Sequence, residues 1–129
     1  MANALYPKGK KKLLDADIDL LVDTMKVSLI DTADETYNAA DEFFSDLTGA
    51  GVVATSGALA GKTTTDGTFD ANDITISAVS GDPVEAVVIW KDTTVTTTSP
   101  LLVWIDGLNF TPNGSNVDVQ FNASGIFSI

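Results

Sequence analysis

The feature that most constrains the fold is the regular spacing of turn residues from Gly49 onward. Gly-Asp-Pro, Asp-Gly and Asn-Gly sequences separate short apolar or alternating segments at intervals of roughly ten residues, which is the pattern of an all-β domain. Together with one segment nearer the N-terminus, this pattern predicts eight short strands: 25–31, 51–55, 63–69, 73–79, 84–91, 101–105, 117–121 and 126–129.

The strand segments differ in how their apolar residues are spaced. Segment 73–79 alternates, with Ile74 and Ile76 on one face and Thr75 and Ser77 on the other. Segment 84–91 is almost continuously apolar, which is typical of a central strand covered on both faces. We therefore expect a mainly β protein, an antiparallel β-sandwich of jelly-roll or immunoglobulin-like type, with one or two short helices near the N-terminus.

Two helices are predicted, both in the first 47 residues. Pro7 is suited to the first turn of a helix over 8–14. Asn38 is a suitable N-cap for a second helix over 39–47, and Asp41 and Glu42 would lie in its first turn, where the helix dipole favours acidic groups. Phe43, Phe44 and Leu47 would then dock that helix on the core.

The chain has 129 residues, the size of one domain, and we find no linker or repeat, so we predict a single β-sandwich domain over 1–129. Its charge is unevenly distributed along the sequence. Lys8, Lys10, Lys11 and Lys12 make 1–14 a basic N-terminal arm. Residues 13–129 hold three lysines against 18 acidic residues, a net charge of −15.

Several residue types are missing, and their absence argues against whole classes of function. The sequence has no His, Cys or Arg, so it offers no His-based triad, no imidazole or thiolate metal site and no guanidinium clamp. We therefore expect a protein that is not an enzyme and uses no cofactor. An acidic body also disfavours nucleic acid and anionic membranes as partners. No signal peptide or membrane-spanning run is present, which predicts synthesis in the cytoplasm.

Two groups of residues have alternative interpretations. Asp66, Asp70 and Asp73 could gather oxygen ligands around structural calcium, although aspartates are also common turn formers. Trp90 and Trp104 each end an apolar segment. Core burial is the simpler interpretation, whereas an exposed Trp would indicate an interface or a sugar-stacking surface.

The basic arm is the candidate partner-docking site. Lys8, Lys10, Lys11 and Lys12 could dock on an acidic surface of a partner or of a second copy of the chain. The alternative is a frayed, solvated terminus. The cluster lacks Arg and interleaved aromatic residues, which argues against nucleic acid.

Six segments of the chain carry a resemblance to a known family: 1–10 (MANALYPKGK), 26–34 (KVSLIDTAD), 53–57 (VATSG), 66–71 (DGTFDA), 78–82 (AVSGD) and 111–114 (TPNG). Together they resemble a family of small tailed-bacteriophage proteins that are encoded among virion genes and are mostly of unassigned role. These motifs are turns and strand pieces, so they mark a fold and a lineage and are not a catalytic signature.

The resemblance implies a bacteriophage virion structural protein. Among such proteins, a small β-sandwich is most similar to a capsid decoration, or cement, protein. This implies a place on the capsid surface, the major capsid protein as partner, and a homo-oligomer (trimer or dimer). The alternative expectation is a tail or fibre-associated protein that recognises a host surface glycan.

Overall fold

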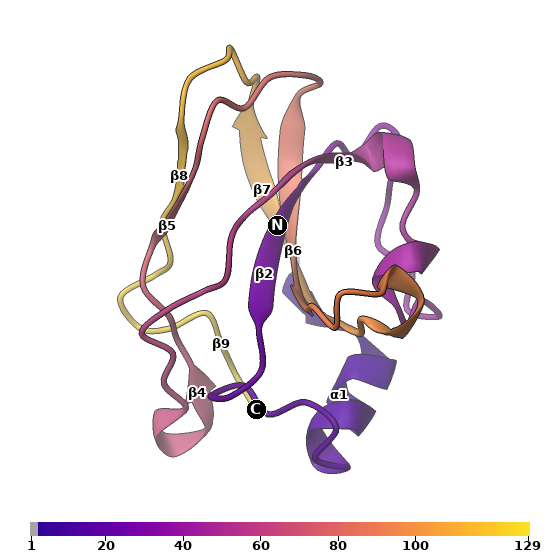
Figure 1. Ribbon diagram of the computed structural model, residues 1–129, viewed down its shortest axis with the longest axis vertical. Helices are drawn as coiled ribbons and strands as arrows, with labels where there is room; N and C mark the ends of the chain where they lie inside the picture. The colour runs from indigo at the N-terminus through magenta and orange to yellow at the C-terminus, as the bar shows by residue number, and fades with distance from the viewer. Residues whose placement is uncertain (1–2) are drawn as a thin grey trace.

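The computed structural model describes residues 3–129, and Met1 and Ala2 of the predicted basic arm lie outside this range. The protein is mainly β, as predicted (Figure 1). The described residues form one five-stranded sheet and two two-stranded sheets, and all strand pairs are antiparallel. The five-stranded sheet has the order β1-β7-β6-β2-β3, with bounds β1 Asn3–Leu5, β7 Leu101–Phe110, β6 Val84–Lys91, β2 Met25–Ile30 and β3 Val52–Thr55.

The two small sheets cover one face of the five-stranded sheet and make the fold sandwich-like. β4 (Thr68–Phe69) pairs with β9 (Phe127–Ser128), and β5 (Ile74–Ile76) pairs with β8 (Val117–Val119). They stand to the left of the large sheet in Figure 1. The core between the layers takes side chains from β2, β6 and β7 on one side and from the small sheets on the other; its fully buried members include Met25, Val27, Val84, Ile89 and Leu102.

The opposite face of the large sheet is covered by less regular structure. Helix α1 (Pro7–Leu14) and the short 3-10 turns η1 (Phe44–Asp46), η2 (Gly49–Gly51) and η4 (Thr96–Thr98) lie to its right in Figure 1. This face has its own core, in which the ring of Phe44 stacks on Trp90 at a centroid distance of 4.1 Å. The fourth 3-10 turn, η3 (Thr65–Gly67), precedes β4.

The central strand matches its prediction in both position and environment. β6 spans Val84–Lys91, and its buried residues contribute to both cores: Val87 and Ile89 to one, Ala86, Val88 and Trp90 to the other. A strand with sheet neighbours on both sides and packed layers on both faces needs apolar residues at successive positions. The helix predicted over 8–14 is also present, as α1, with Pro7 in its first turn.

The second predicted helix, over 39–47, is wrong. The Asn38 side chain accepts a hydrogen bond from the Ala40 amide, which makes a turn and not a helix cap. The backbone then bonds to the segment before β7: the Phe44 amide donates to the Ser99 carbonyl, and the Leu101 amide donates to the Glu42 carbonyl. These long-range bonds replace helical bonds, so only η1 remains helical. Phe44 and Leu47 still contact the core.

Two glycines, Gly107 and Gly114, lie where the strands differ from the predicted pattern. The strand predicted over 101–105 is longer in the structure. Gly107 does not close β7, which continues to Phe110; its φ of +92° allows an irregularity where the register against β6 shifts. Asn113-Gly114 makes a turn, with Gly114 at a φ of +91°, but not a hairpin between neighbouring strands. The strands on either side of it belong to different sheets, because β8 pairs with β5.

Candidate functional site

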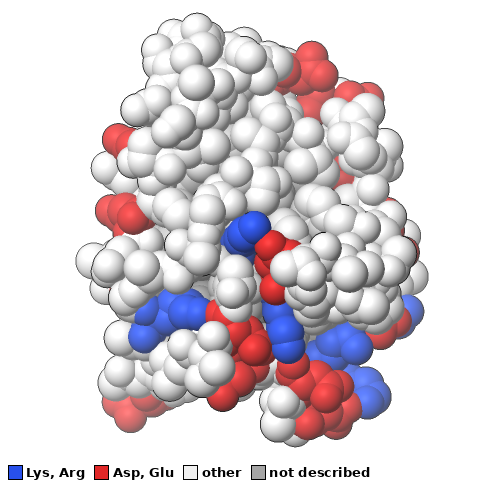
Figure 2. Space-filling view, viewed as in Figure 1, with Lys and Arg blue, Asp and Glu red and all other residues white. Residues whose placement is uncertain are grey.

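The sheet brings all seven lysines to one end of the molecule. Antiparallel pairing sets the first residue of β2, Met25, opposite the last residue of β6, Lys91, and α1 begins beside the start of β7, where the Tyr6 amide donates to the Leu102 carbonyl. Figure 2 shows lysine side chains over the middle and lower part of the face, among acidic groups, and none over its upper part. We call this region the lysine end; it comprises Lys8, Lys10, Lys11, Lys12, Lys26, Lys62 and Lys91.

Helix α1 is held tightly against the sheet. Gly9 is buried, and a Cβ atom built on it would lie 2.4 Å from the Leu101 carbonyl oxygen. Tyr6, just before the helix, is fully buried, and burial raises the pKa of its hydroxyl well above the ordinary value. Residues 3–14 are therefore packed on the body and do not extend away from it.

Two of the predicted docking lysines contact one carboxylate outside the helix. The Lys8 and Lys12 ammonium groups lie 3.8 and 3.2 Å from the Glu42 carboxylate. The Lys12 ammonium also lies 5.1 Å from the centroid of the Phe43 ring, within cation–π range. Glu42 thus forms ion pairs with two of the four lysines of the arm. The backbone beside it is extended at Phe43, just before η1 begins.

The remaining two lysines, Lys10 and Lys11, are exposed and form no ion pair with Glu42. Lys11 pairs with Asp15, one helical turn away, and this hydrogen bond raises the pKa of Lys11. Lys10 is exposed, and none of the ion pairs within residues 3–129 includes it. Exposed apolar side chains follow in the same stretch of chain, at Leu14 and at Leu21 and Val22. The outward surface of this stretch therefore combines apolar area with charges of both signs, because Asp15, Asp17 and Asp19 are exposed as well.

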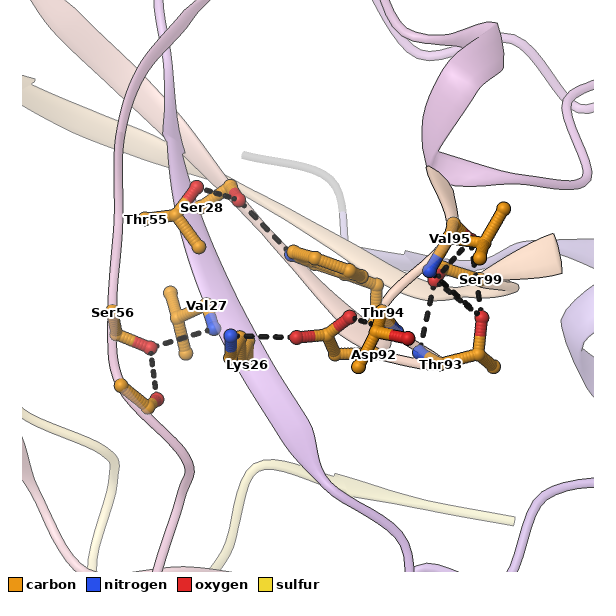
Figure 3. A network of polar contacts seen from close by, with 12 residues as sticks. Lys26, Val27, Ser28, Thr55, Ser56, Asp92, Thr93, Thr94, Val95 and Ser99 are labelled. Atoms are coloured by element: carbon orange, nitrogen blue, oxygen red, sulfur yellow. Dashed lines mark hydrogen bonds and ion pairs between the residues drawn. The ribbon is translucent and has the colours of Figure 1, made fainter. Parts of the chain in front are cut away.

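An ion pair between Lys26 of β2 and Asp92, directly after β6, connects the ends of these two strands (Figure 3). The Lys26 ammonium lies 2.6 Å from the Asp92 carboxylate, which also accepts a hydrogen bond from the Thr94 amide. These two contacts lower the pKa of Asp92. In the same way, the Lys91 ammonium lies 3.0 Å from the Asp23 carboxylate. For Asp23, hydrogen bonds from the Asp19 amide and Lys91 outweigh burial and lower the pKa.

A second set of contacts in Figure 3 crosses the sheet itself. The indole N–H of Trp90 donates to the Ser28 hydroxyl at 2.9 Å, and the Ser28 and Thr55 hydroxyls lie 2.8 Å apart. These side chains come from β6, β2 and β3, so the chain of bonds links three adjacent strands. Trp90 and Trp104 are 5% and 3% exposed, so the core interpretation of both tryptophans is confirmed.

The opposite end of the sheet carries acidic groups and none of the lysines. Asp31 follows β2, and its carboxylate lies within 4.8 Å of those of Asp34 and Asp82. Glu85 follows on β6 and accepts hydrogen bonds from the backbone and hydroxyl of Thr32. We call this region the acidic end; it comprises Asp31, Asp34, Asp82, Glu85 and Asp106. The sequence gives no local signal for this group because it depends on the pairing of β2 with β6.

The three aspartates considered for calcium are used separately. Asp66 lies in η3 with a φ of +52°, the Asp70 carboxylate accepts from the Ala71 amide, and the Asp73 carboxylate accepts from the Phe121 amide. Within residues 3–129, the acidic residues gathered closely enough to share an ion are Asp31, Asp34 and Asp82 instead. Of these only Asp31 is buried.

No protein-family model matches the chain, and no curated protein matches it. None of the helices in residues 3–129 has both the length and the apolar character needed to cross a membrane.

Proposed function

We propose that the protein is a bacteriophage virion structural protein, specifically a capsid decoration protein that bridges and stabilises neighbouring capsid subunits. The major capsid protein would be its partner, and the capsid surface its place. The observation that carries the proposal is the separation of two chemically different ends on one rigid sheet. A bridging protein needs two separate contact surfaces, and the lysine end and the acidic end support the proposal as candidates for these surfaces.

The lysine end is the better candidate for docking on the capsid. Lys8, Lys10 and Lys11 are exposed, but Lys8 shares the Glu42 carboxylate with Lys12 and Lys11 pairs with Asp15 on the same helix. Next to the exposed cations stands Leu14, whose exposed fraction is 83%. Rim charges mainly steer association and make it salt-sensitive, while buried apolar contact slows dissociation.

Quantitative composition of purified particles tests the proposal directly. We expect the chain at a copy number comparable with that of the shell subunits. Absence from the particle, or presence at about a dozen copies or fewer, would rule out shell decoration.

Variants at the lysine end test the docking surface. We expect Lys10→Ser/Lys11→Ser to weaken capsid binding at low salt by roughly tenfold or more, because two exposed charges are lost. Lys8→Ser/Lys12→Ser is the matched control: it removes the same charge but from lysines that contact Glu42, and its effect should be smaller. Unchanged binding at low salt after replacement of all four lysines would refute a docking role for them.

The alternative proposal is a tail or fibre protein that recognises a host glycan. Such a protein needs exposed aromatic rings on which sugars stack. Trp90, Trp104 and Tyr6 are buried, and Tyr37 is only half-buried, so the structure supports this alternative less well. Binding of the purified protein on a glycan array would favour it over decoration.

A further inference from the structure

Exposed apolar side chains gather at the end of the molecule where α1 passes into β2. Three of the large apolar side chains that are exposed within residues 3–129, Leu14, Leu21 and Val22, lie in this connection. The C-terminus, and with it the exposed Ile129, lies at the same lower end in Figure 1. Single exposed apolar residues are ordinary on protein surfaces, but a group of them in one place indicates a contact surface. We call the exposed side chains of 10–22 the α1–β2 surface.

The backbone that carries these apolar side chains is held in place by hydrogen bonds. Ile18 is buried in the core and anchors the connection. The Asp19 carboxylate accepts hydrogen bonds from the amides of Leu21 and Val22, at 3.1 and 3.3 Å. The Asp19 amide in turn donates to the Asp23 carboxylate at 2.8 Å. Leu21 and Val22 are therefore presented to solvent by an ordered, hydrogen-bonded turn.

The segment 8–23 is electrically neutral, unlike the rest of the chain. It holds four lysines followed by four aspartates, whereas the remaining residues hold three lysines and 14 acidic residues, a net charge of −11. Two copies of so acidic a protein repel each other over most of their surfaces. The repulsion is weakest where the two neutral segments face each other, which restricts where a second copy can approach.

The order of the charges makes this segment complementary to itself. Lysines occupy α1 and aspartates follow the helix, with Leu14 between the two groups. Lys10 and Asp17 are exposed, and none of the ion pairs within residues 3–129 includes either of them. If a second copy is related by a twofold axis near Leu14, Lys10 of each copy faces Asp17 of the other. A twofold contact of this kind uses the same surface of both copies and forms each pair twice.

We propose that the α1–β2 surface is a twofold self-association surface, on which a second copy of the chain covers Leu14, Leu21 and Val22 and pairs Lys10 with Asp17. Apolar contact supplies most of the affinity, and the charge pairs set the orientation. A contact built on so few side chains is smaller than a standard interface, so we expect a weak dimer, with a dissociation constant on the order of 100 µM.

The proposal goes beyond capsid decoration and does not depend on it. Lys10 cannot face two partners at once, so the dimer would have to open before this surface docks on a capsid. Self-association is measured on the purified chain without any capsid protein, so failure of one proposal leaves the other intact.

Sedimentation velocity of the full chain tests the apolar part of the contact, at concentrations from roughly 10 µM to 1 mM. We expect Leu14→Asp and Val22→Asp to weaken dimerisation by roughly tenfold or more, because each places a charge in the apolar contact. Val95→Asp is the matched control at an exposed apolar residue elsewhere, and it should leave dimerisation unchanged. Circular dichroism checks that the variants are folded. A strictly monomeric wild-type protein, or a folded Val22→Asp protein that dimerises like the wild type, would overturn the proposal.

A charge exchange tests the orientation. Lys10→Asp and Asp17→Lys should each weaken dimerisation by roughly threefold or more, and an equimolar mixture of the two variants should restore it, because every pair then has opposite charges again. Asp17→Lys also lowers the net negative charge, so general repulsion alone predicts stronger association for this variant. Asp34→Lys is the matched control: it makes the same charge change at an exposed residue of the acidic end and should not weaken dimerisation.

Two outcomes of these measurements would contradict the twofold contact. One is a mixture of Lys10→Asp and Asp17→Lys that associates no more tightly than either variant alone. The other is association that is lost in Ile129→Lys but unaffected by Val22→Asp and by the charge exchange, which would place the contact at the C-terminus alone.

Discussion

At the scale of single residues, the hydrogen bond between Trp90 and Ser28 is the most informative contact. Ser28 keeps the Thr55 hydroxyl as a partner when the indole N–H is removed, but a buried indole N–H loses its acceptor when Ser28 is replaced. An unsatisfied buried donor costs about 1–3 kcal/mol, more than a hydrogen bond lost with both partners replaced. The two positions therefore are not equivalent.

This asymmetry predicts the result of a double-mutant cycle. We expect Ser28→Ala to lower the free energy of unfolding by about 1–3 kcal/mol in the wild-type background and by less in a Trp90→Phe background, because phenylalanine has no donor to leave unsatisfied. Urea unfolding followed by circular dichroism measures all four corners. Strictly additive effects would mean that the bond contributes no coupling energy.

Asp92 predicts a pH dependence of stability. Its pKa lies below the ordinary value in the folded protein, so the unfolded state binds the proton more tightly. The stabilisation is complete above the unfolded pKa, about 4, and is lost as the pH falls through the folded value. Asp92→Asn should cost about 1 kcal/mol at pH 7 and flatten the decline below pH 5. Thermal unfolding from pH 7 to 2 measures both.

A matched variant separates this effect from simple loss of one negative charge. Asp17→Asn removes a charge from an exposed side chain at the same end of the molecule. Its unfolding temperature should follow the wild-type pH profile. If Asp92→Asn also follows that profile, the contacts with Lys26 and Thr94 do not contribute to acid stability.

At the scale of elements, contact between α1 and β7 depends on Gly9. A Cβ at this position would lie 2.4 Å from the Leu101 carbonyl oxygen and 3.1 Å from the Leu102 Cα. Gly9→Ala should therefore destabilise the fold by about 1–3 kcal/mol from overpacking, although alanine is the better helix former by about 1 kcal/mol. Urea unfolding measures the change, and Lys10→Ala, at the exposed neighbour, should change it by less than about 0.5 kcal/mol. A stabilised Gly9→Ala protein would contradict the close approach.

The elements that could be predicted are those whose environment follows from their own residues. Nearly continuous apolar character located β6 and its burial on both faces, and Pro7 located the start of α1. Residues 39–47 carry helix signals too, but their backbone groups are used by residues 99–101, far away in the sequence. Local propensity is a weak guide where such long-range bonds compete with it.

The candidate sites could also be predicted only in part from local sequence patterns. The sequence identified a cluster of four lysines, Lys8, Lys10, Lys11 and Lys12. It could not show that Lys8 and Lys12 contact Glu42 whereas Lys10 and Lys11 do not. The acidic end was missed because its carboxylates come together only through the pairing of β2 with β6. No local pattern could reveal either feature, because each depends on which segments the tertiary fold places side by side.

At the scale of the whole molecule, self-association remains a prediction. The segment 126–129 is apolar, and β9 within it pairs with β4, but Ile129 keeps 74% of its surface exposed. We expect sedimentation equilibrium to show dimers or trimers at high concentration and Ile129→Lys to weaken them, since a charged terminus opposes apolar contact. The control is Val95→Lys, which adds the same charge at an exposed apolar residue elsewhere and should leave association unchanged. Thr68→Lys would not serve, because Thr68 contacts Ser128. A strictly monomeric protein would contradict the expectation.

The strand order has a consequence for how the chain acquires its structure. β1 and β2 lie in the first 30 residues, yet their sheet partners β7 and β6 begin only at Leu101 and Val84. Such pairing requires closure of long loops, which slows folding relative to proteins built from local contacts. During synthesis β2 can pair with β3, but β1 has no sheet partner until β7 has left the ribosome. A nascent chain truncated before β7 therefore cannot complete its central sheet.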